Sequence, residues 1–204
     1  MNLVSLIFNK DKHYMIKFIK RLFSKQKYEH NIIVNNENDI ITHLSNDDTA
    51  VYATYKKRLI PFLYVTLMSE AKCSCTIFVK HIDNMMLSGQ DLESLFKQMQ
   101  RNSVYIELIT FEQNDMFMRM ITKLNSQSPV KIQLYVGEVN GIRKFQNFIV
   151  TDGRRYLLEQ SYPVDYDYSD DNIQTNYSMN NPLGCKWLIH LSQQYKQQIT
   201  GNIK

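Results

Sequence analysis

The sequence has few of the residues that form flexible linkers, covalent cross-links or membrane spans. It contains six glycines, four prolines and three cysteines in 204 residues. No apolar run reaches the roughly 18 residues of a transmembrane helix, and neither common type of Gly-rich phosphate-binding loop is present. These absences argue against a Pro- or Gly-rich protein, a disulfide-framed miniprotein, an integral membrane protein and the common nucleotide-binding proteins.

Hydrophobic residues make up 44% of the chain and charged residues 22%, which is typical of a globular protein. A chain of this length buries roughly 70% of its unfolded surface, so it forms a full core without cross-links. The composition therefore predicts one domain, alone or with a short additional segment.

Positive charge is concentrated at the N-terminus. Residues 1–28 contain seven Lys and Arg and one Asp, a net charge of +6, whereas the remaining 176 residues carry 17 basic and 19 acidic side chains. Within this basic arm, Tyr14–Phe23 has apolar residues at helical spacing, which predicts a short basic amphipathic helix. The residues that we assign to its contacts are Lys17, Phe18, Lys20 and Arg21.

Three interpretations of the basic arm are open at this stage. The helix packs on its own domain with a solvated cationic face, or it lies on an anionic membrane surface or an acidic protein partner. The third interpretation is a nucleic-acid contact through residues 10–27, because contacts to phosphates give affinity without sequence preference. The composition of the remaining chain does not predict a basic body that follows a phosphate backbone.

The pattern divides the chain into an arm, a connector and a body. Residues 29–45 mix a short apolar run with Asn and Asp, which predicts a polar connector. The body, residues 46–204, begins with capping residues for a helix from Asn46 that extends toward Met68, with a break or kink at Pro61.

Helical and strand patterns alternate through the rest of the body. This alternation predicts an α/β fold with a layered mixed sheet, mainly parallel up to a C-terminal hairpin. The expected elements are a strand Cys75–Val79, a helix from Ser88, a strand Val104–Phe111, a helix from Asn114 or Asp115, a strand Val130–Val136, hairpin strands Lys144–Val150 and Arg154–Glu159 around Asp152-Gly153, a polar loop Tyr162–Asn181 and a helix from Pro182.

The three cysteines indicate neither a disulfide nor a metal site. Their number is odd, and the apolar Met1–Phe8 precedes the positive charges, which is the reverse of a secretion signal. We therefore expect reduced thiols and a cytoplasmic location, with peripheral membrane contact through the arm as an alternative. Cys73 and Cys75 are expected on one face of a strand, and neither they nor Cys185 have a second Cys or His pair at metal-binding spacing. We expect no metal and no cofactor.

The order of elements from residue 49 to residue 199 resembles one half of the phospholipase D superfamily. In that family a β-α-β-α-β run leads to a strand with the motif His-x-Lys-x4-Asp. Aligning the family's aspartate with Asp152 puts Phe145 at the histidine position and Asn147 at the lysine position. The family's later Gly-Ser pair is also missing, with Leu158-Glu159 near its place.

The replaced residues are those that carry the family's chemistry, which implies an imidazole nucleophile on phosphorus and a lysine that neutralises developing charge. Phe145 can neither attack nor transfer a proton, and Asn147 has no charge. None of the five histidines is followed two residues later by Lys. The resemblance therefore implies a degenerate, non-catalytic domain that serves as a binding or scaffolding module for a protein partner. Because catalytic members pair two such halves, it also suggests a homodimer.

An enzyme of another kind remains the alternative. Asp152, Glu159 and His81 would serve a phosphodiesterase or nuclease if they converged with one arginine in a single open cleft. Asp152 also suits the hairpin turn better than any other residue, which gives it a purely structural explanation.

Basic and polar residues around the hairpin suggest a small anion-binding patch. Arg154 and Arg155 alternate across the strand, so only one of them can share a face with Lys144. The competing interpretation is a solvated hairpin balanced by the acidic loop. The ligand-binding candidates are Lys144, Asn147, Arg154 and Arg155.

Overall fold

The computed structural model divides the chain into one unit of residues 1–32 and one of residues 33–204. The predicted helix at Tyr14–Phe23, with the contact residues assigned to it, lies outside the residues that the structure describes. Among those that it describes, no helix is long and apolar enough to cross a membrane. The described residues are 32–111, 113–137, 144–160, 162–163 and 172–200.

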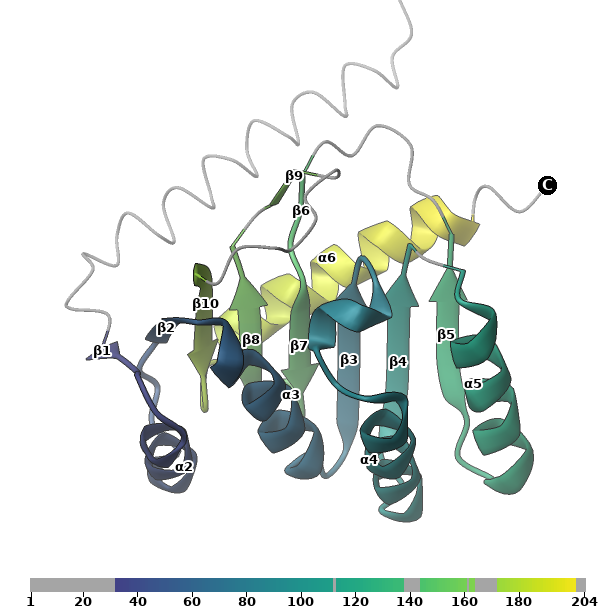
Figure 1. Ribbon diagram of the computed structural model, residues 1–204, viewed down its shortest axis with the longest axis horizontal. Helices are drawn as coiled ribbons and strands as arrows, with labels where there is room; N and C mark the ends of the chain where they lie inside the picture. The colour runs from purple at the N-terminus through teal and green to yellow at the C-terminus, as the bar shows by residue number, and fades with distance from the viewer. Residues whose placement is uncertain (1–31, 112, 138–143, 161, 164–171, 201–204) are drawn as a thin grey trace, which may run out of the picture. The chain divides into compact units, whose positions relative to one another are not determined.

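Eight strands form one mixed sheet in the order β1-β2-β10-β8-β7-β3-β4-β5 (Figure 1). Strands β3, β4 and β5 are parallel, and every pairing from β3 through β7, β8 and β10 to β2 is antiparallel. The predicted α/β class with a mixed sheet is confirmed. The strands are β1 (Ile32–Ile33), β2 (Tyr52–Lys56), β3 (Ser74–Val79), β4 (Tyr105–Thr110), β5 (Ile132–Val136), β7 (Phe148–Thr151), β8 (Arg155–Glu159) and β10 (Asn172–Ser178), with a separate pair β6 (Lys144–Phe145) and β9 (Tyr162–Pro163).

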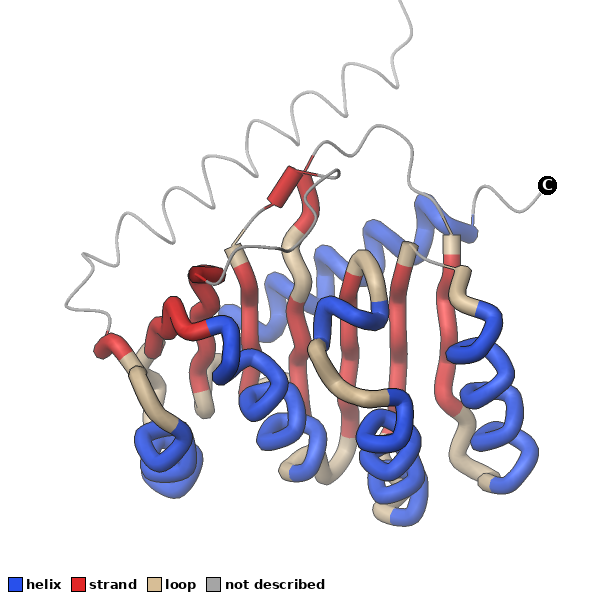
Figure 2. The backbone as a smooth tube through the Cα atoms, in the orientation of Figure 1, coloured by secondary structure: helices blue, strands red, loops and turns tan. Residues whose placement is uncertain are grey.

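Helices cover both faces of this sheet (Figure 2). Four α-helices lie on one face and α6 lies on the other, so the described residues form three layers (Figure 1). The helices are α2 (Glu37–Asn46), α3 (Ile60–Ser69), α4 (Gly89–Arg101), α5 (Asp115–Gln127) and α6 (Pro182–Thr200), with the short 3-10 helices η1 (Lys57–Leu59) and η2 (Ile82–Met85).

Side-chain alternation along the strands divides the core into two apolar clusters. In β3, Ile77 belongs to the cluster that contains the α3 and α4 side chains, and its neighbour Phe78 belongs to the cluster beneath α6. The Phe78 ring stacks on Tyr195 of α6 with 4.3 Å between ring centroids. Because burying a phenylalanine contributes roughly 2–3 kcal/mol, this contact is a substantial part of what fixes α6 to the sheet.

The predicted starts of α4 and α5 are confirmed by their caps. The Ser88 hydroxyl accepts a hydrogen bond from the Asp91 N–H at 3.1 Å, and the Asn114 side chain accepts one from the Phe117 N–H at 3.0 Å. Each cap satisfies a backbone N–H that has no partner within the first turn of the helix.

The prediction of a helix from Asn46 toward Met68 is wrong. Asp47, with a φ of 50°, ends α2, and the residues that follow form β2 and η1 before α3 begins. Strand β2 pairs with β10, so tertiary hydrogen bonding overrides the local helical spacing. Helix α2 lies largely within the predicted connector, 29–45, and buries Ile40 completely.

The predicted polar loop Tyr162–Asn181 is also corrected, because it contains β10. This strand lies between β2 and β8, well inside the sheet. Its buried residues Ile173, Thr175 and Tyr177 recur with a period of two and alternate with Gln174 and Asn176. The strand pattern is therefore present in the sequence, but its high polarity conceals it.

The predicted hairpin and its turn are confirmed, but the first strand, predicted over Lys144–Val150, is divided into β6 and β7. The turn also fixes a neighbouring loop. Asp152 and Gly153 have φ angles of 54° and 64°, and the Arg154 N–H donates to the Thr151 carbonyl at 3.1 Å. The Asp152 carboxylate accepts hydrogen bonds from the N–H groups of residues 72, 73 and 74 at 2.7–3.1 Å. Asp152 therefore connects the hairpin to the segment between α3 and β3.

Replacing Asp152 tests this structural role. Asp152→Asn keeps a residue that tolerates positive φ but removes the charge and one acceptor. The free energy of unfolding, measured by chemical denaturation, should fall by about 1–2 kcal/mol, because hydrogen bonds to charged groups are stronger than neutral ones. Asp83→Asn, at an exposed residue, is the control and should change it by less than about 0.5 kcal/mol. Equal losses in the two variants would contradict the assignment.

Candidate functional site at the strand ends

Polar side chains from several neighbouring strands lie together where those strands begin or end. Strand β8 runs in the same direction as β3, because β7 is antiparallel to both. The end of β3, the start of β7 and the end of β8 therefore lie side by side. In open α/β sheets, ligands bind at the carboxyl ends of the strands. We call the following residues the strand-end site: Thr54, Tyr64, Lys80, Phe145, Asn147, Glu159 and Thr175.

Asn147 connects β3 to β8 through its side-chain amide. The Oδ1 atom accepts a hydrogen bond from the backbone N–H of Lys80 at 3.0 Å, and the Nδ2 group donates to Oε2 of Glu159 at 2.9 Å. The backbone carbonyl of Asn147 accepts from the Glu159 N–H at 2.9 Å. Asn147 is fully buried, so both ends of its amide serve the interior of the domain.

Glu159 is a carboxylic acid enclosed in the core. It is completely buried, and Oε1 accepts a hydrogen bond of 3.4 Å from the Tyr64 hydroxyl. Burial raises the pKa of Glu159 to about 8, although the hydrogen bonds from Asn147 and Tyr64 favour the ionised form. The carboxyl is therefore mainly protonated at neutral pH.

A row of buried polar residues continues from Glu159 across the next two strands. Thr175 of β10 is directly opposite Glu159, and Thr54 of β2 is directly opposite Thr175. Both threonines are fully buried. The Thr175 hydroxyl has no hydrogen-bond partner among the described residues.

Phe145 closes the site on the side of β6. Its ring is 1% exposed and belongs to the apolar cluster beneath α3 and α4. The Lys80 ammonium lies 5.3 Å from the centroid of this ring, a cation–π distance. An aromatic ring packed in the core thus occupies the position that the resemblance assigns to a histidine.

Of the three alternative catalytic residues, Glu159 belongs to the strand-end site, His81 follows its Lys80 in the chain, and Asp152 lies elsewhere. His81 follows Lys80 at the end of β3 and is the N-cap residue of η2. Its backbone N–H donates to the Asn84 side chain at 2.9 Å. Asp152 lies at the opposite end of the hairpin. Four residue steps of about 3.3 Å along β8 separate Glu159 from the turn by about 13 Å, so the three groups do not converge.

The ligand-binding candidates are also divided between the two ends of the hairpin strands. Arg154 forms an ion pair with Asp47, and Arg155 donates to the Glu70 carbonyl at the C-terminus of α3 at 3.3 Å. Both arginines therefore stabilise the structure around the hairpin turn. A cation such as Arg155 is favourable beside the carbonyl groups at the C-terminus of a helix. Lys144 pairs with Pro163 in the β6–β9 sheet, and its side chain lies outside the described part.

The cysteines are not arranged as the strand pattern predicts. Cys73 is exposed and precedes β3, whereas Cys75 is buried within it. Burial raises the pKa of the Cys75 thiol, and it raises that of Cys185 to about 12. Among the described residues, no cluster of three His, Cys, Asp or Glu side chains is placed to bind a metal.

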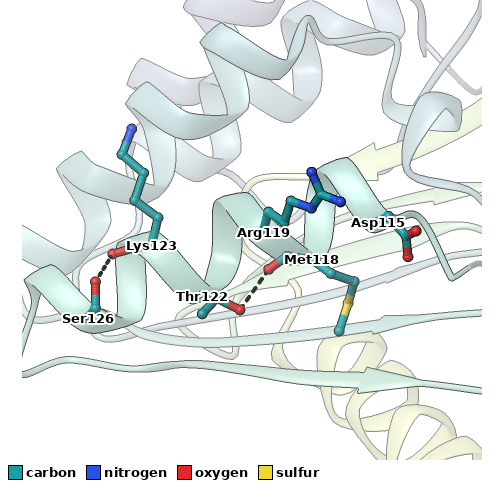
Figure 3. Close-up of a pocket in the computed structure, with 6 residues that line it drawn as sticks. All are labelled: Asp115, Met118, Arg119, Thr122, Lys123 and Ser126. Atoms are coloured by element: carbon teal, nitrogen blue, oxygen red, sulfur yellow. Dashed lines mark hydrogen bonds between the residues drawn. The ribbon is translucent and has the colours of Figure 1, made fainter.

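A groove of about 600 Å³ lies away from this site, along α5 at the β5 end of the sheet. Figure 3 shows its lining, all from one helix. Lys123 donates to Glu93 of α4 at 3.0 Å, which orients one side of the groove. The lining residues are Asp115, Met118, Arg119, Thr122, Lys123 and Ser126.

Solved structures of other proteins share this architecture. No protein-family profile and no curated protein sequence matches the chain. Among solved structures, it is similar to Nuc, a phospholipase D family member from Salmonella typhimurium, with a TM-score of 0.55 at 11% identity, over 74% of this chain and 96% of Nuc. The chain has a phospholipase-D-like fold.

A second solved structure extends the likeness along the chain. This phospholipase-D-like chain is similar to TrmBL2, an archaeal chromatin protein described with a novel mode of DNA binding, with a TM-score of 0.55 at 7% identity. The match covers 96% of this chain and 69% of TrmBL2. At such identities the likeness establishes the fold alone.

Sequence reasoning identified Asn147 and Glu159 but missed their surroundings. Tyr64 lies in the apolar helix α3, whose sequence pattern predicts only one more core residue at this position. Thr175 lies in the strand that polar residues conceal. The signal for Tyr64 is its single hydroxyl within a run of buried apolar side chains, because a buried tyrosine hydroxyl usually has a partner.

The raised pKa of Glu159 makes stability depend on pH. The folded-state pKa of about 8 lies above the ordinary value of 4.5, so the folded protein retains a proton that the unfolded chain releases in this window. The contribution of Glu159 to stability is complete below pH 4.5 and is lost as the pH rises through 8. Glu159→Gln removes this titration.

We therefore expect the free energy of unfolding of the wild type, relative to that of Glu159→Gln, to fall by a few kcal/mol from pH 4.5 to pH 8, since one pKa unit corresponds to about 1.4 kcal/mol. Urea denaturation of both proteins across this range measures the difference. Parallel pH profiles would contradict the raised pKa.

Proposed function

We propose that this phospholipase-D-like domain is a non-catalytic binding or scaffolding module for a protein partner. The observation that carries the proposal is the state of Asn147. Its amide is fully buried and engaged at both ends, with Lys80 and with Glu159. A side chain in this state has no free group to offer a phosphodiester.

The chemistry of the neighbouring position supports the same proposal. Phosphoryl transfer through a covalent intermediate needs a nucleophile with a lone pair and a cation near the transferred group. The buried Phe145 ring has no such lone pair. The Lys80 ammonium is positioned over that ring, at 5.3 Å from its centroid.

The alternative of a phosphodiesterase or nuclease that uses Asp152 and Glu159 has less support. It requires both carboxyl groups in one open cleft. Asp152 instead binds the backbone of residues 72–74. Glu159 lies in the core, about 13 Å along β8 from the hairpin turn. Asp152 and Glu159 therefore each have a structural role where they lie.

An activity assay on the full chain tests the proposal. We expect no turnover of bis(p-nitrophenyl) phosphate or of single- and double-stranded DNA by the purified protein, with or without divalent metal ions. Glu159→Gln is assayed in parallel to identify contaminating nuclease, because a contaminant is unaffected by the substitution. Turnover by the wild type that Glu159→Gln abolishes would overturn the non-catalytic proposal.

The basic arm supports a second candidate function, nucleic-acid contact. Residues 1–28 carry a net charge of +6 on a chain whose remaining residues sum to −2. The similar TrmBL2 structure, which matches 96% of this chain, is described as binding DNA. We propose that residues 10–27 make contacts to phosphates, which would attach the domain to DNA without sequence preference.

Salt dependence tests this contact. The affinity for duplex DNA should fall with salt, and the combined change Lys17→Gln, Lys20→Gln and Arg21→Gln should reduce the log–log slope by about three, at about 0.9 per phosphate contact. The control changes three exposed basic residues of the body, Lys72, Arg101 and Lys186, to Gln and should preserve the slope.

A membrane contact is the competing outcome for the arm. Phe18→Ser should leave DNA affinity unchanged and abolish binding to anionic phosphatidylserine vesicles if the apolar face inserts into lipid. Vesicle binding without DNA binding would therefore reassign the arm.

A further inference from the structure

Helix α2 is attached to the sheet by few side chains. It lies at the β2 end of the sheet (Figure 1), and Ile40 is its one fully buried residue. The residue after the helix, Asp47, is held separately by an ion pair with Arg154 and by a hydrogen bond of 3.3 Å from the Asn180 side chain to its carbonyl. Between Ile40 and Asp47 lies His43, which is half-buried. Elements with so few buried side chains open most readily.

His43 joins α2 to two strands through a stack of aromatic rings. Its imidazole lies nearly parallel to the Tyr52 ring of β2, with 3.6 Å between the ring centroids and 12° between the planes. Tyr52 in turn stacks on Tyr177 of β10, with 5.3 Å between the centroids. The Tyr52 hydroxyl donates to the carboxylate of Asp48, in the loop that follows α2. The three rings and this carboxylate therefore form one cluster that connects α2, the loop, β2 and β10.

The Tyr177 hydroxyl depends on His43 for its hydrogen bond. Tyr177 is fully buried, and within the described residues its hydroxyl has one hydrogen-bond partner, the Nδ1 atom of His43 at 2.8 Å. Burial raises the pKa of both Tyr177 and Tyr52, so both hydroxyl groups keep their protons. Because a buried hydroxyl proton needs an acceptor, the Tyr177 O–H donates and Nδ1 accepts. The single proton of the neutral imidazole is therefore on Nε2.

Protonation of His43 removes this acceptor. An imidazolium ion has an N–H group at each nitrogen atom, so Nδ1 can no longer accept the Tyr177 proton, and leaving a buried donor unsatisfied is unfavourable. Burial also lowers the pKa of His43, against the opposite effect of the Asp48 and Asp39 carboxylates. The attached state of α2 thus favours the uncharged imidazole.

We propose that His43 makes the attachment of α2 to the sheet sensitive to pH. With a neutral imidazole, α2 is held against Tyr52 and Tyr177. With an imidazolium ion it opens from them, while Asp47 stays paired with Arg154, and the two tyrosine rings become accessible in acid. This change is independent of any activity at the strand-end site. The groups that face the imidazole are Asp39 of α2, Asp48 of the loop, Tyr52 of β2 and Tyr177 of β10.

Amide hydrogen exchange on the full chain tests this sensitivity. Because the pKa of His43 is lowered in the attached state, the opened state binds more protons, and opening becomes more favourable as the pH falls below 6.5. After correction for the intrinsic pH dependence of exchange, protection of the α2 amides should fall roughly three- to tenfold between about pH 7.5 and about pH 5.5, the range for one hydrogen bond. The α4 amides should show no such fall. Unchanged or greater protection of α2 at the lower pH overturns the proposal.

Three variants assign the pH response to His43. His43→Gln keeps an oxygen that can accept from Tyr177 but cannot be protonated, so it should abolish the response. His190→Gln is the matched control, because His190 is exposed on α6, and it should preserve the response. Tyr177→Phe keeps the imidazole but removes the hydroxyl that loses its acceptor, so it should reduce the response. A response that survives His43→Gln, disappears in His190→Gln or is undiminished in Tyr177→Phe contradicts the assignment.

NMR of the imidazole nitrogen atoms tests the hydrogen bond in the wild type, without any substitution. Neutral His43 should be the Nε2–H tautomer, and its pKa should lie below the ordinary value of 6.5. The Nδ1–H tautomer, or a pKa above 6.5, overturns the proposed direction of the response.

Discussion

The β7–β8 hairpin is the constraint on which this fold depends. Strand β7 joins the parallel half of the sheet, through β3, to the antiparallel half, through β8. Both ends of the hairpin are tied to other parts of the chain by side-chain amide or carboxylate groups. Asp152 binds the segment before β3 at one end, and Asn147 binds the residue after β3 at the other. The position of β3, and with it the strand-end site, follows from these two attachments.

The strand-end site illustrates how polar residues remain in a core when hydrogen bonds satisfy their polar groups. Asn147, Glu159 and Tyr64 are each buried, and both Asn147 and Tyr64 donate a hydrogen bond to the Glu159 carboxyl. A neutral carboxyl is cheaper to bury than an ionised one, because desolvation penalises only the charged form strongly. The raised pKa of Glu159 is thus the consequence of a closed interior, and a perturbed pKa by itself does not identify a catalytic acid.

The sequence predicts the helices and strands whose patterns are strong and local. Ser88 and Asn114 mark helix starts, and the Asp152-Gly153 pair marks the hairpin, because each of these signals acts through hydrogen bonds or φ angles within a few residues. Strands β2 and β10 could not be predicted in the same way. Each pairs with a partner more than a hundred residues away in the chain, and the polar residues of β10 resemble a loop.

The same distinction applies to the candidate site. The replacement of the family's histidine and lysine by Phe145 and Asn147 is visible in the sequence. The separation of Asp152 from Glu159 follows from the length of β8 alone. By contrast, the contact of Tyr64 with Glu159 joins a helix to a strand that follows it by 95 positions, and no local pattern reports such a contact.

Among the described residues, α6 is the only helix on its face of the sheet, and it follows every described strand (Figure 1). During synthesis, the sheet surface that bears Phe78, Phe148 and Tyr156 lacks the cover of α6 until the ribosome has released residues 182–200. The nascent chain therefore exposes this aromatic surface from the synthesis of β8 until that of α6, and it is the kind of surface that chaperones bind. Completion of the last helix, and not of the sheet, ends this vulnerable interval.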